Sequence, residues 1–192
     1  MEGLMMANIQ LTHAPILNSS AQLLILPVNT VGILLDPVLT RTKTLFPDNY
    51  QRYYRACRDG SLSVGSCLLH KRALEQAGLS ISSNGNQPSY IANLVISNHP
   101  YHPAKSQWFI AALNDLSQQL IPLIRYQGIR RVALLARPLV YDNSRDDAND
   151  VPNSKNLMPL DWHTDTLPLL TKYLQDLPKI RIDIHLPKDI NI

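Results

Sequence analysis

The sequence contains little glycine and little cysteine. Only seven of its 192 residues are glycine, so few positions can form the glycine-rich loops that bring backbone N–H groups close to phosphate, and its 14 prolines remove further N–H donors. Cys57 and Cys67 lack the spacing of a metal site and are too few for a disulfide framework. We therefore expect two reduced thiols.

Long apolar runs and a strong charge of either sign are missing as well. No stretch approaches the ~18 continuous apolar residues of a membrane span. The N-terminal MEGLMMANIQ has no basic region followed by an apolar one, as a signal peptide would. The net charge of +3 is too small to indicate nucleic-acid binding by itself. We expect a cytoplasmic protein that does not associate with membranes, and nucleic-acid binding stays open.

What remains is the composition of an ordinary globular domain, with 45% apolar and 17% charged residues. A chain of 192 residues can bury a sizeable core as one domain. No linker or internal repeat divides it, so we expect a single domain over residues 1–192. Residues 142–156 (DNSRDDANDVPNSKN) are polar and rich in turn formers, which predicts a surface insert within that domain.

Short apolar runs alternate with segments of helical periodicity. The expected strands span residues 23–28, 63–71, 90–96, 131–136 and 180–186. The expected helices span residues 47–56, 106–126 and 168–177. Ser106 is suited to the N-cap of the longest helix, and Gly128 to its end. This alternation predicts an α/β fold in which helices cover a mixed sheet.

One distinctive motif directly follows the first apolar run. It reads Val28-Asn29-Thr30-Val31-Gly32, and a Phe-Pro pair, a tyrosine-rich segment ending near a cysteine and a DGSLSVG turn come after it in order. Fainter matches follow: YIAN at 90–93, KS at 105–106 and LDW at 160–162. Together these motifs resemble the macrodomain family, and within it the branch of DNA ADP-ribosyl glycohydrolases. The resemblance spans roughly residues 23–174.

The resemblance implies a macrodomain-like three-layer sandwich, with a mixed sheet between helices and ADP-ribose in a cleft at the strand ends. In that family two loops hold the diphosphate through backbone N–H groups, and the asparagine after the strand contacts the distal ribose. Carried over, this makes Asn29, Thr30 and Gly32 ligand-binding residues, with ADP-ribose or a related nucleotide as the ligand. The alternative is that the Asn29 amide only caps a tight turn beside Gly32.

The first phosphate loop departs from the family pattern. Its glycine positions hold Leu35 and Pro37, with Asp36 between them. Pro37 has no N–H to donate, and Asp36 places a negative charge where the diphosphate would lie. The same pair also fits a helix N-cap followed by proline at the first helical position. Both interpretations predict a loop that holds phosphate poorly.

The second phosphate loop and the catalytic position depart too. The family's glycine-rich run is replaced by LARPLV over residues 135–140. Arg137 could bind phosphate through its guanidinium, or it could be a solvated arginine or a partner of Asp142. A lysine serves catalysis in the DNA-directed branch, and its position falls near Ser97, which has no ammonium group. The catalytic residues therefore remain unassigned.

The remaining candidates for chemistry are histidines and tryptophans. His99 and His102 lie three residues apart, but no third ligand is close and prolines interrupt the segment, so we expect no metal site and no cofactor. Trp108 and Trp162 are expected in the core or at its rim. The other candidates, to which no chemistry is assigned, are His13, His70 and His185, which we place on strand-like runs.

The glycine losses decide between two functions. Losing two or three charge-assisted N–H donors, each worth ~1.5–3 kcal/mol, would remove micromolar affinity for ADP-ribose. We therefore expect a degenerate macrodomain, a pseudoenzyme with weak or no hydrolase activity, which acts as a binding module or docks a protein partner. The alternative is an active ADP-ribose-binding or ADP-ribosyl glycohydrolase macrodomain that removes ADP-ribose from nucleic acid or protein.

Overall fold

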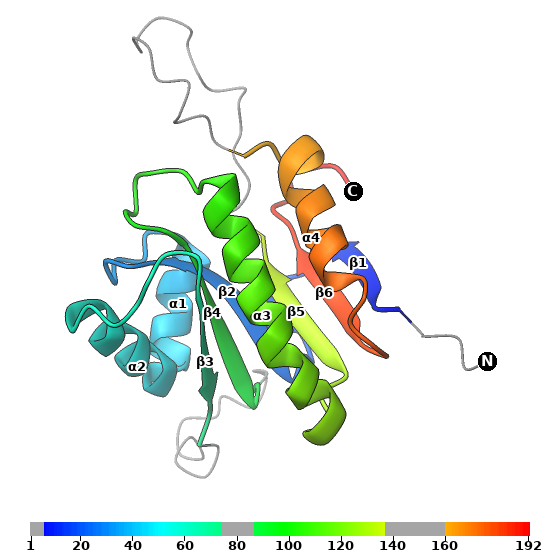
Figure 1. The fold of residues 1–192 in the computed structure, drawn as a ribbon, viewed down its shortest axis with the longest axis horizontal. Coiled ribbons are helices and arrows are strands. Elements are labelled where there is room, and N and C mark those ends of the chain that lie inside the picture. Colours follow the sequence, from blue (N-terminus) through cyan, green and yellow to red (C-terminus); the bar gives the residue numbers. More distant parts are fainter. Residues whose placement is uncertain (1–5, 74–86, 137–159) are drawn as a thin grey trace, which may run out of the picture.

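A computed structural model describes residues 6–73, 87–136 and 160–192 of the chain. In this part of the chain, six strands form one sheet in the order β1-β6-β5-β2-β4-β3 (Figure 1). The strands are β1 (Asn8–Thr12), β2 (Leu23–Asn29), β3 (Cys67–Lys71), β4 (Tyr90–Ser97), β5 (Arg131–Leu135) and β6 (Arg181–His185). The α-helices are α1 (Pro37–Leu45), α2 (Pro47–Arg58), α3 (Ser106–Tyr126) and α4 (Leu167–Leu174). Two shorter helices are η1 (Ile16–Asn18) and the π-helix η5 (Trp162–Thr166).

The sheet is mixed, because five strands run parallel and only β3 pairs antiparallel, with β4. The carboxyl ends of the parallel strands therefore meet at one edge of the sheet. In open α/β sheets this edge is where ligands bind. None of the helices in the described ranges is long and apolar enough to cross a membrane.

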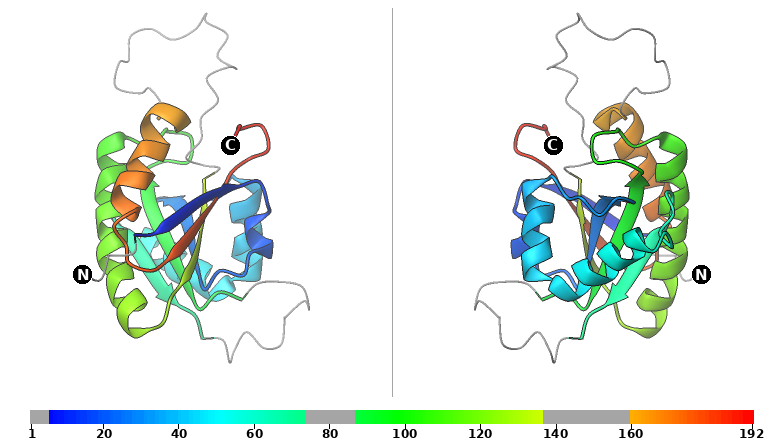
Figure 2. Two further views of the ribbon diagram at one scale, coloured as in Figure 1. Left: turned by 90° about the vertical axis from the view of Figure 1, so that its right-hand side faces the viewer. Right: turned by 90° about the vertical axis from the view of Figure 1, so that its left-hand side faces the viewer.

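The three layers follow from the two central strands, in which every residue is buried. Helices α3 and α4 cover one face of the sheet, and α1 lies against the other (Figure 2). Alternate residues of β2 serve the two faces: Leu23 and Ile25 pack in the cluster with α3 and α4, whereas Leu24 and Leu26 pack with Leu39 of α1. The expected α/β sandwich with a mixed sheet between helices is confirmed.

Helix α3 has the predicted bounds but not the predicted cap. The residue before the helix is Lys105, whose extended backbone precedes the first helical residue, Ser106, so the assignment of Ser106 as N-cap is wrong by one position. The Lys105 carbonyl already accepts the first helical bond, from the Phe109 N–H at 3.0 Å. After the helix, Gly128 adopts a φ of +69°, which lets the Ile129 N–H reach back to the helix.

Several other boundaries differ from the sequence-based expectation. The strand expected over residues 63–71 begins only at Cys67, because a turn precedes it: Gly65 has a φ of +81° and the Ser66 hydroxyl donates to the Ser63 carbonyl at 2.6 Å. The last helix ends at Leu174 and follows the π-helix η5. Strand β1 is not among the five expected strands, although His13, the residue after it, was placed on a strand-like run. The insert expected over residues 142–156 lies outside the described residues.

Candidate functional site

Two hollows lie at the edge of the sheet where the parallel strands end. We call the first the β2–β4 cleft; it has a volume of about 120 Å³ and is lined by the ends of β2 and β4, residues 33–36, residues 99–100 and residues 102–104. The second, which we call the β5–β6 pocket, has a volume of about 490 Å³ and lies between residues 13–17, Val38 and the ends of β5 and β6. The predicted ligand-binding residue Asn29 lines the cleft.

The turn after β2 is held together by the side chain of Asn29, which is 8% exposed. Its Nδ2 donates to the Ile33 carbonyl at 2.8 Å, and its Oδ1 accepts from the N–H groups of Val31 at 2.9 Å and Gly32 at 3.1 Å. This is the capping arrangement that the Asn-x-x-Gly spacing allowed. The amide of Asn29 therefore stabilises its own turn, and contact with a ligand stays a prediction.

Gly32 is required in this turn by its backbone and by its packing. Its φ is +83°, and a Cβ at this position would come within 2.9 Å of Cδ2 of Tyr54. Two other tyrosines of α2 hold the turn by hydrogen bonds: Tyr50 donates to the Gly32 carbonyl at 3.3 Å, and Tyr53 to the Asn29 carbonyl at 2.7 Å. Burial raises the pKa of Tyr53, which keeps this hydroxyl a donor. The tyrosine-rich helix therefore clamps the turn.

The N-terminus of α1 is capped by Asp36, as its sequence pattern predicts. Asp36 Oδ1 accepts from the N–H groups of Val38 at 2.8 Å and Leu39 at 3.3 Å. Pro37, at the first helical position, has no N–H to donate. An anion bound at a helix N-terminus uses these same N–H groups. The carboxylate of Asp36 thus occupies the place where a phosphate would bind.

Thr30 and Ser97 join the turn to the loop after β4. The Thr30 N–H donates to the Ser97 carbonyl at 3.1 Å, where the pairing of β2 and β4 shifts register. Ser97 is buried, and its Oγ lies 2.5 Å from the His99 carbonyl and accepts from the His99 N–H at 3.1 Å. Ser97 organises this loop, and no lysine is found among the described residues that line the cleft.

His99 and His102 both line the β2–β4 cleft. Their rings are 4.4 Å apart, and His99 Nδ1 accepts from the Tyr101 N–H at 3.2 Å. Within residues 6–73, 87–136 and 160–192, no group of three potential metal ligands occurs. Of the other predicted site residues, Thr30 and Gly32 lie in the turn with Asn29, whereas Arg137 is outside the described residues.

The β5–β6 pocket has mainly apolar walls, which include Ile16, Leu17, Val38, Leu135 and Leu186. His13 and His185 also line it, and each has one buried ring nitrogen without a hydrogen-bond partner in the described part of the chain: Nδ1 of His13 and Nε2 of His185. Sequence reasoning assigned these residues no chemistry. It also placed His13 on a strand, but β1 ends one residue earlier.

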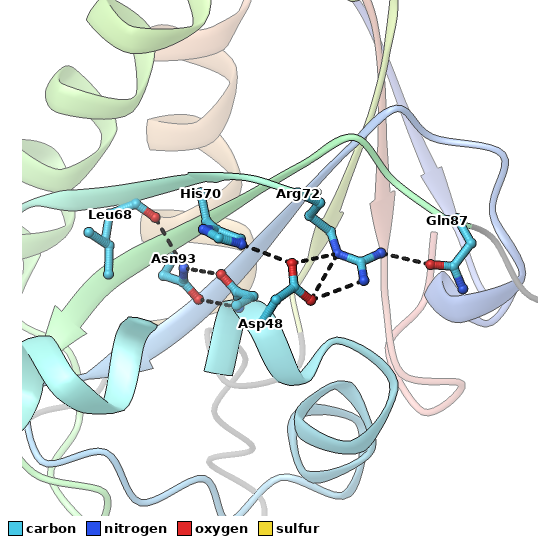
Figure 3. Close-up of polar contacts among 7 residues, drawn as sticks. Asp48, Leu68, His70, Arg72, Gln87 and Asn93 are labelled. Carbon is cyan, nitrogen blue, oxygen red and sulfur yellow. Dashed lines mark hydrogen bonds and ion pairs between the residues drawn. The ribbon is translucent and has the colours of Figure 1, made fainter. Parts of the chain in front are cut away.

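A polar cluster anchors α2 to β3 (Figure 3). The carboxylate of Asp48 lies between Arg72, at 3.0 Å from Nη2, and His70, at 2.9 Å from Nε2. Burial acts to raise the pKa of Asp48, but the bonds from Arg72 and His70 outweigh it, so this pKa lies below its ordinary value. Nearby, Asn49 and Asn93 exchange amide hydrogen bonds of 3.1 and 2.8 Å. The cluster therefore holds α2 in place, and α2 is the helix whose tyrosines bond to the turn after β2.

Known proteins similar to this chain include one curated relative. No family model matches the sequence. The relative is a DNA ADP-ribosyl glycohydrolase of Thermus aquaticus, 30% identical over 124 residues, which are 65% of this chain and 30% of that protein. This chain therefore matches less than a third of the relative's length.

Solved structures give a longer match. The macrodomain of Thermus aquaticus DarG has a TM-score of 0.67 and 23% identity, covering 94% of this chain and 99% of that one. The macrodomain of Mycobacterium tuberculosis DarG has a TM-score of 0.68 and 22% identity, covering 95% and 99%. Thermosipho africanus DarTG, solved in complex with ADP-ribose, has a TM-score of 0.68 and 23% identity, covering 96% and 43%. The likeness to these structures is one of fold.

Proposed function

We propose that this chain, which has the macrodomain fold, is a degenerate macrodomain: a binding module with weak or no hydrolase activity. Its ligand is the nucleoside end of an ADP-ribose-related nucleotide. The Thermus aquaticus relative is a DNA ADP-ribosyl glycohydrolase, and the Thermosipho africanus protein was solved with ADP-ribose, which supports this class of ligand. We further propose that the protein acts in the cytoplasm.

One observation carries the proposal: the N–H groups at the N-terminus of α1 are already bonded to Asp36. A phosphate would have to displace this carboxylate and then lie beside its charge. Two lost charge-assisted hydrogen bonds, each worth ~1.5–3 kcal/mol, correspond to a loss of roughly two to four orders of magnitude in affinity. The diphosphate therefore contributes little to binding in this turn.

The β2–β4 cleft is also poorly equipped for hydrolysis. Ser97 lies where the resemblance places the catalytic lysine, and its hydroxyl is bonded to the loop that follows β4. The carboxylate of Asp36 already accepts hydrogen bonds from the N–H groups of Val38 and Leu39. Neither group is placed to act as an efficient general acid or base.

Of the two hollows formed by described residues at this edge, the β5–β6 pocket has the size of a ligand site. Its volume of about 490 Å³ falls within the ~300–1,000 Å³ typical of small-molecule sites, whereas the 120 Å³ cleft does not. Apolar walls with a few polar atoms suit an uncharged ring system. A nucleoside therefore fits the chemistry of the pocket better than a phosphate does.

A protein partner is a second candidate, favoured by the surface of the turn. Val31, Ile33 and Leu35 are 40%, 48% and 50% exposed, and they alternate in sequence through the turn after β2 and the residues before α1. Aliphatic side chains grouped in this way often mark a protein contact. A partner seated here would cover the mouth of the β2–β4 cleft.

Calorimetric titrations with ADP-ribose and with adenosine test the proposal. We expect wild-type protein to bind adenosine, and to bind ADP-ribose no more than about tenfold more tightly, because the diphosphate adds little. The double variant Asp36→Gly, Pro37→Gly exposes the helix N-terminus and should gain affinity for ADP-ribose but not for adenosine. Asp161→Gly, which removes an acidic cap from η5, is the matched control and should change neither affinity.

Activity is measured by incubating the protein with ADP-ribosylated DNA, and we expect no release of ADP-ribose above the uncatalysed rate. Efficient release would overturn the proposal. So would wild-type binding of ADP-ribose more than a hundredfold tighter than adenosine that Asn29→Ala abolishes, because that result would mean that the turn still holds the diphosphate and ribose.

A further inference from the structure

We propose that the exposed side of α2 is a docking surface for an acidic, helix-forming segment of another protein. The surface consists of Arg52, Arg55 and Arg58 of α2 together with Lys43 of α1, and we call these four residues the α2 cation row. The inference goes beyond the nucleoside binding proposed above, because none of the four residues lines the β5–β6 pocket.

The positive charge of the chain is concentrated in α1 and α2. Residues 37–59 hold five Lys or Arg and two Asp, an excess of three that equals the net charge of the whole chain. The two helices follow each other through Phe46 and lie next to each other in space (Figure 2). The excess charge is therefore local, and a local excess of one sign favours a partner of the opposite sign.

No acidic side chain on the exposed side of α2 offsets this charge. The exposed residues of the helix are Pro47, Gln51, Arg52, Tyr54, Arg55 and Arg58. Asp48 of the same helix is half-buried and already bonded within the polar cluster of Figure 3, and Asp59, just after the helix, interacts with Arg55. In the part of the chain that the structure describes, none of the four cations forms a salt bridge. Their charges therefore remain accessible to a partner.

Two tyrosine rings hold the ends of the α2 cation row. The Lys43 ammonium lies 4.5 Å from the centre of the Tyr50 ring, and the Arg58 guanidinium lies 6.0 Å from the centre of the Tyr54 ring. The two rings stack on each other with their centres 5.7 Å apart. Such contacts reduce the freedom that long side chains would lose on binding. Lys43, Arg55 and Arg58 also lie in the last turn of their helices, where positive charge is favourable, but this interaction does not neutralise them.

The spacing of the arginines fits a helical partner. Arg52, Arg55 and Arg58 recur at every third residue, so successive side chains are about 4.5 Å apart along the helix axis. A helix with acidic residues at every third or fourth position presents its carboxylates at about 4.5–6 Å, which matches this spacing. Tyr54 is 40% exposed among the arginines and adds apolar surface, which suits an amphipathic segment.

A single-stranded nucleic acid is the other kind of polyanion that positive charge attracts. Proteins bind such strands with aromatic rings on which the bases stack. Here Tyr50 and Tyr54 stack on each other, and each already lies against a cation. A base could stack only after these contacts were broken, so the observations favour an acidic protein segment.

Fluorescence anisotropy with two synthetic peptides tests the inference. The probe is a labelled peptide of about 20 residues of Glu, Ala and Leu, in which Glu recurs at every third or fourth position. A scrambled peptide of the same composition carries the same charge without the pattern. We expect the patterned peptide to bind about tenfold more tightly than the scrambled one, and its binding to weaken as the salt concentration rises from about 50 to about 200 mM.

The double variant Arg52→Glu, Arg55→Glu should bind the patterned peptide at least about tenfold more weakly than wild type. Arg125→Glu, Lys172→Glu is the matched control, because it reverses two exposed charges on α3 and α4, which cover the other face of the sheet; its affinity should stay within about twofold of wild type. Arg52→Gln, Arg55→Gln removes the charge and keeps a good helix former at both positions, so it guards against a failure to fold and should show a smaller loss.

Equal binding of the two peptides, or equal weakening by both charge-reversal variants, would mean that only net charge attracts the peptide and would overturn the inference. So would the absence of saturable binding at millimolar peptide. A single-stranded oligothymidylate that binds more tightly than the patterned peptide would overturn it in favour of a nucleic acid. Adenosine binding is measured on the same proteins and should not change in the arginine variants. Its absence in the wild type would overturn the proposed function and leave this inference standing.

Discussion

The β2–β4 cleft and the β5–β6 pocket lie at the same edge of one sheet, but they differ in how far their polar side chains are hydrogen-bonded within the protein. In the cleft, Asn29, Asp36 and Ser97 satisfy nearby backbone groups with their own side chains. In the pocket, His13 and His185 each have one ring nitrogen that finds no partner among the residues the structure describes. The fold places both hollows where parallel strands end, and the side chains decide which of them is available to a ligand.

Among the variants that test this comparison, Gly32→Ala is expected to change the free energy of unfolding most. The left-handed backbone and the close approach of Tyr54 should together destabilise the protein by about 2–4 kcal/mol. Urea unfolding measures the change. Gly60→Ala is the matched control, because Gly60 also has a positive φ but a Cβ there would meet nothing within 4 Å, so only about 1–2 kcal/mol is expected.

The same variant separates the two hollows. Gly32→Ala distorts the turn that closes the cleft, whereas the walls of the β5–β6 pocket, apart from Val38, come from other segments. Adenosine binding by the folded variant should therefore remain within about twofold of wild type. Equal destabilisation at positions 32 and 60 would show that the contact with Tyr54 does not shape the turn.

An intermediate effect is expected from the anchor of α2. The lowered pKa of Asp48 means that its charged form is stabilised by folding, so its contribution is present above pH 3.8 and is lost as the pH falls through its folded pKa. Asp48→Asn should therefore be less stable than wild type at pH 6. The urea midpoints of the two proteins should converge below about pH 4, and a constant difference down to pH 2.5 would contradict the pairing with Arg72.

The parts of the molecule that could be predicted from sequence are those set by neighbouring residues. Residues 23–28 of β2 are all apolar because both faces of the strand are buried, and the cap at Asp36 depends only on the residues that follow it. The bounds of helix α3 were predicted correctly because its apolar residues recur at helical spacing.

The parts that were missed depend on distant residues. Strand β1 is short and partly exposed, and it exists because Ile9 pairs opposite Ile182 at the other end of the chain. The ring of His185 is held by a hydrogen bond between Nδ1 and the Ala14 carbonyl, 171 residues away in sequence. An unsatisfied nitrogen in a pocket wall has no local signature, since it results from what several segments fail to supply. By alternation, His185 falls on the same side of the strand as Arg181 and Asp183, so the sequence pattern did not predict its burial.

The smallest expected effect is on the reactivity of the two thiols. Cys57 lies behind the turn of the cleft, and Cys67 lies in the core. Burial raises the pKa of Cys67 to about 12 and also raises the pKa of the half-buried Cys57, so iodoacetamide should modify both more slowly than a free thiol at pH 8. Cys57 should react first, because Cys67 is buried. The Sγ of Cys57 lies 3.8 Å from the Asn29 carbonyl, behind the turn, so Gly32→Ala should accelerate its modification and leave Cys67 unchanged. Gly60→Ala should accelerate neither, and equal acceleration of both thiols by Gly32→Ala would mean that the whole domain opens and that the turn is not a separate unit.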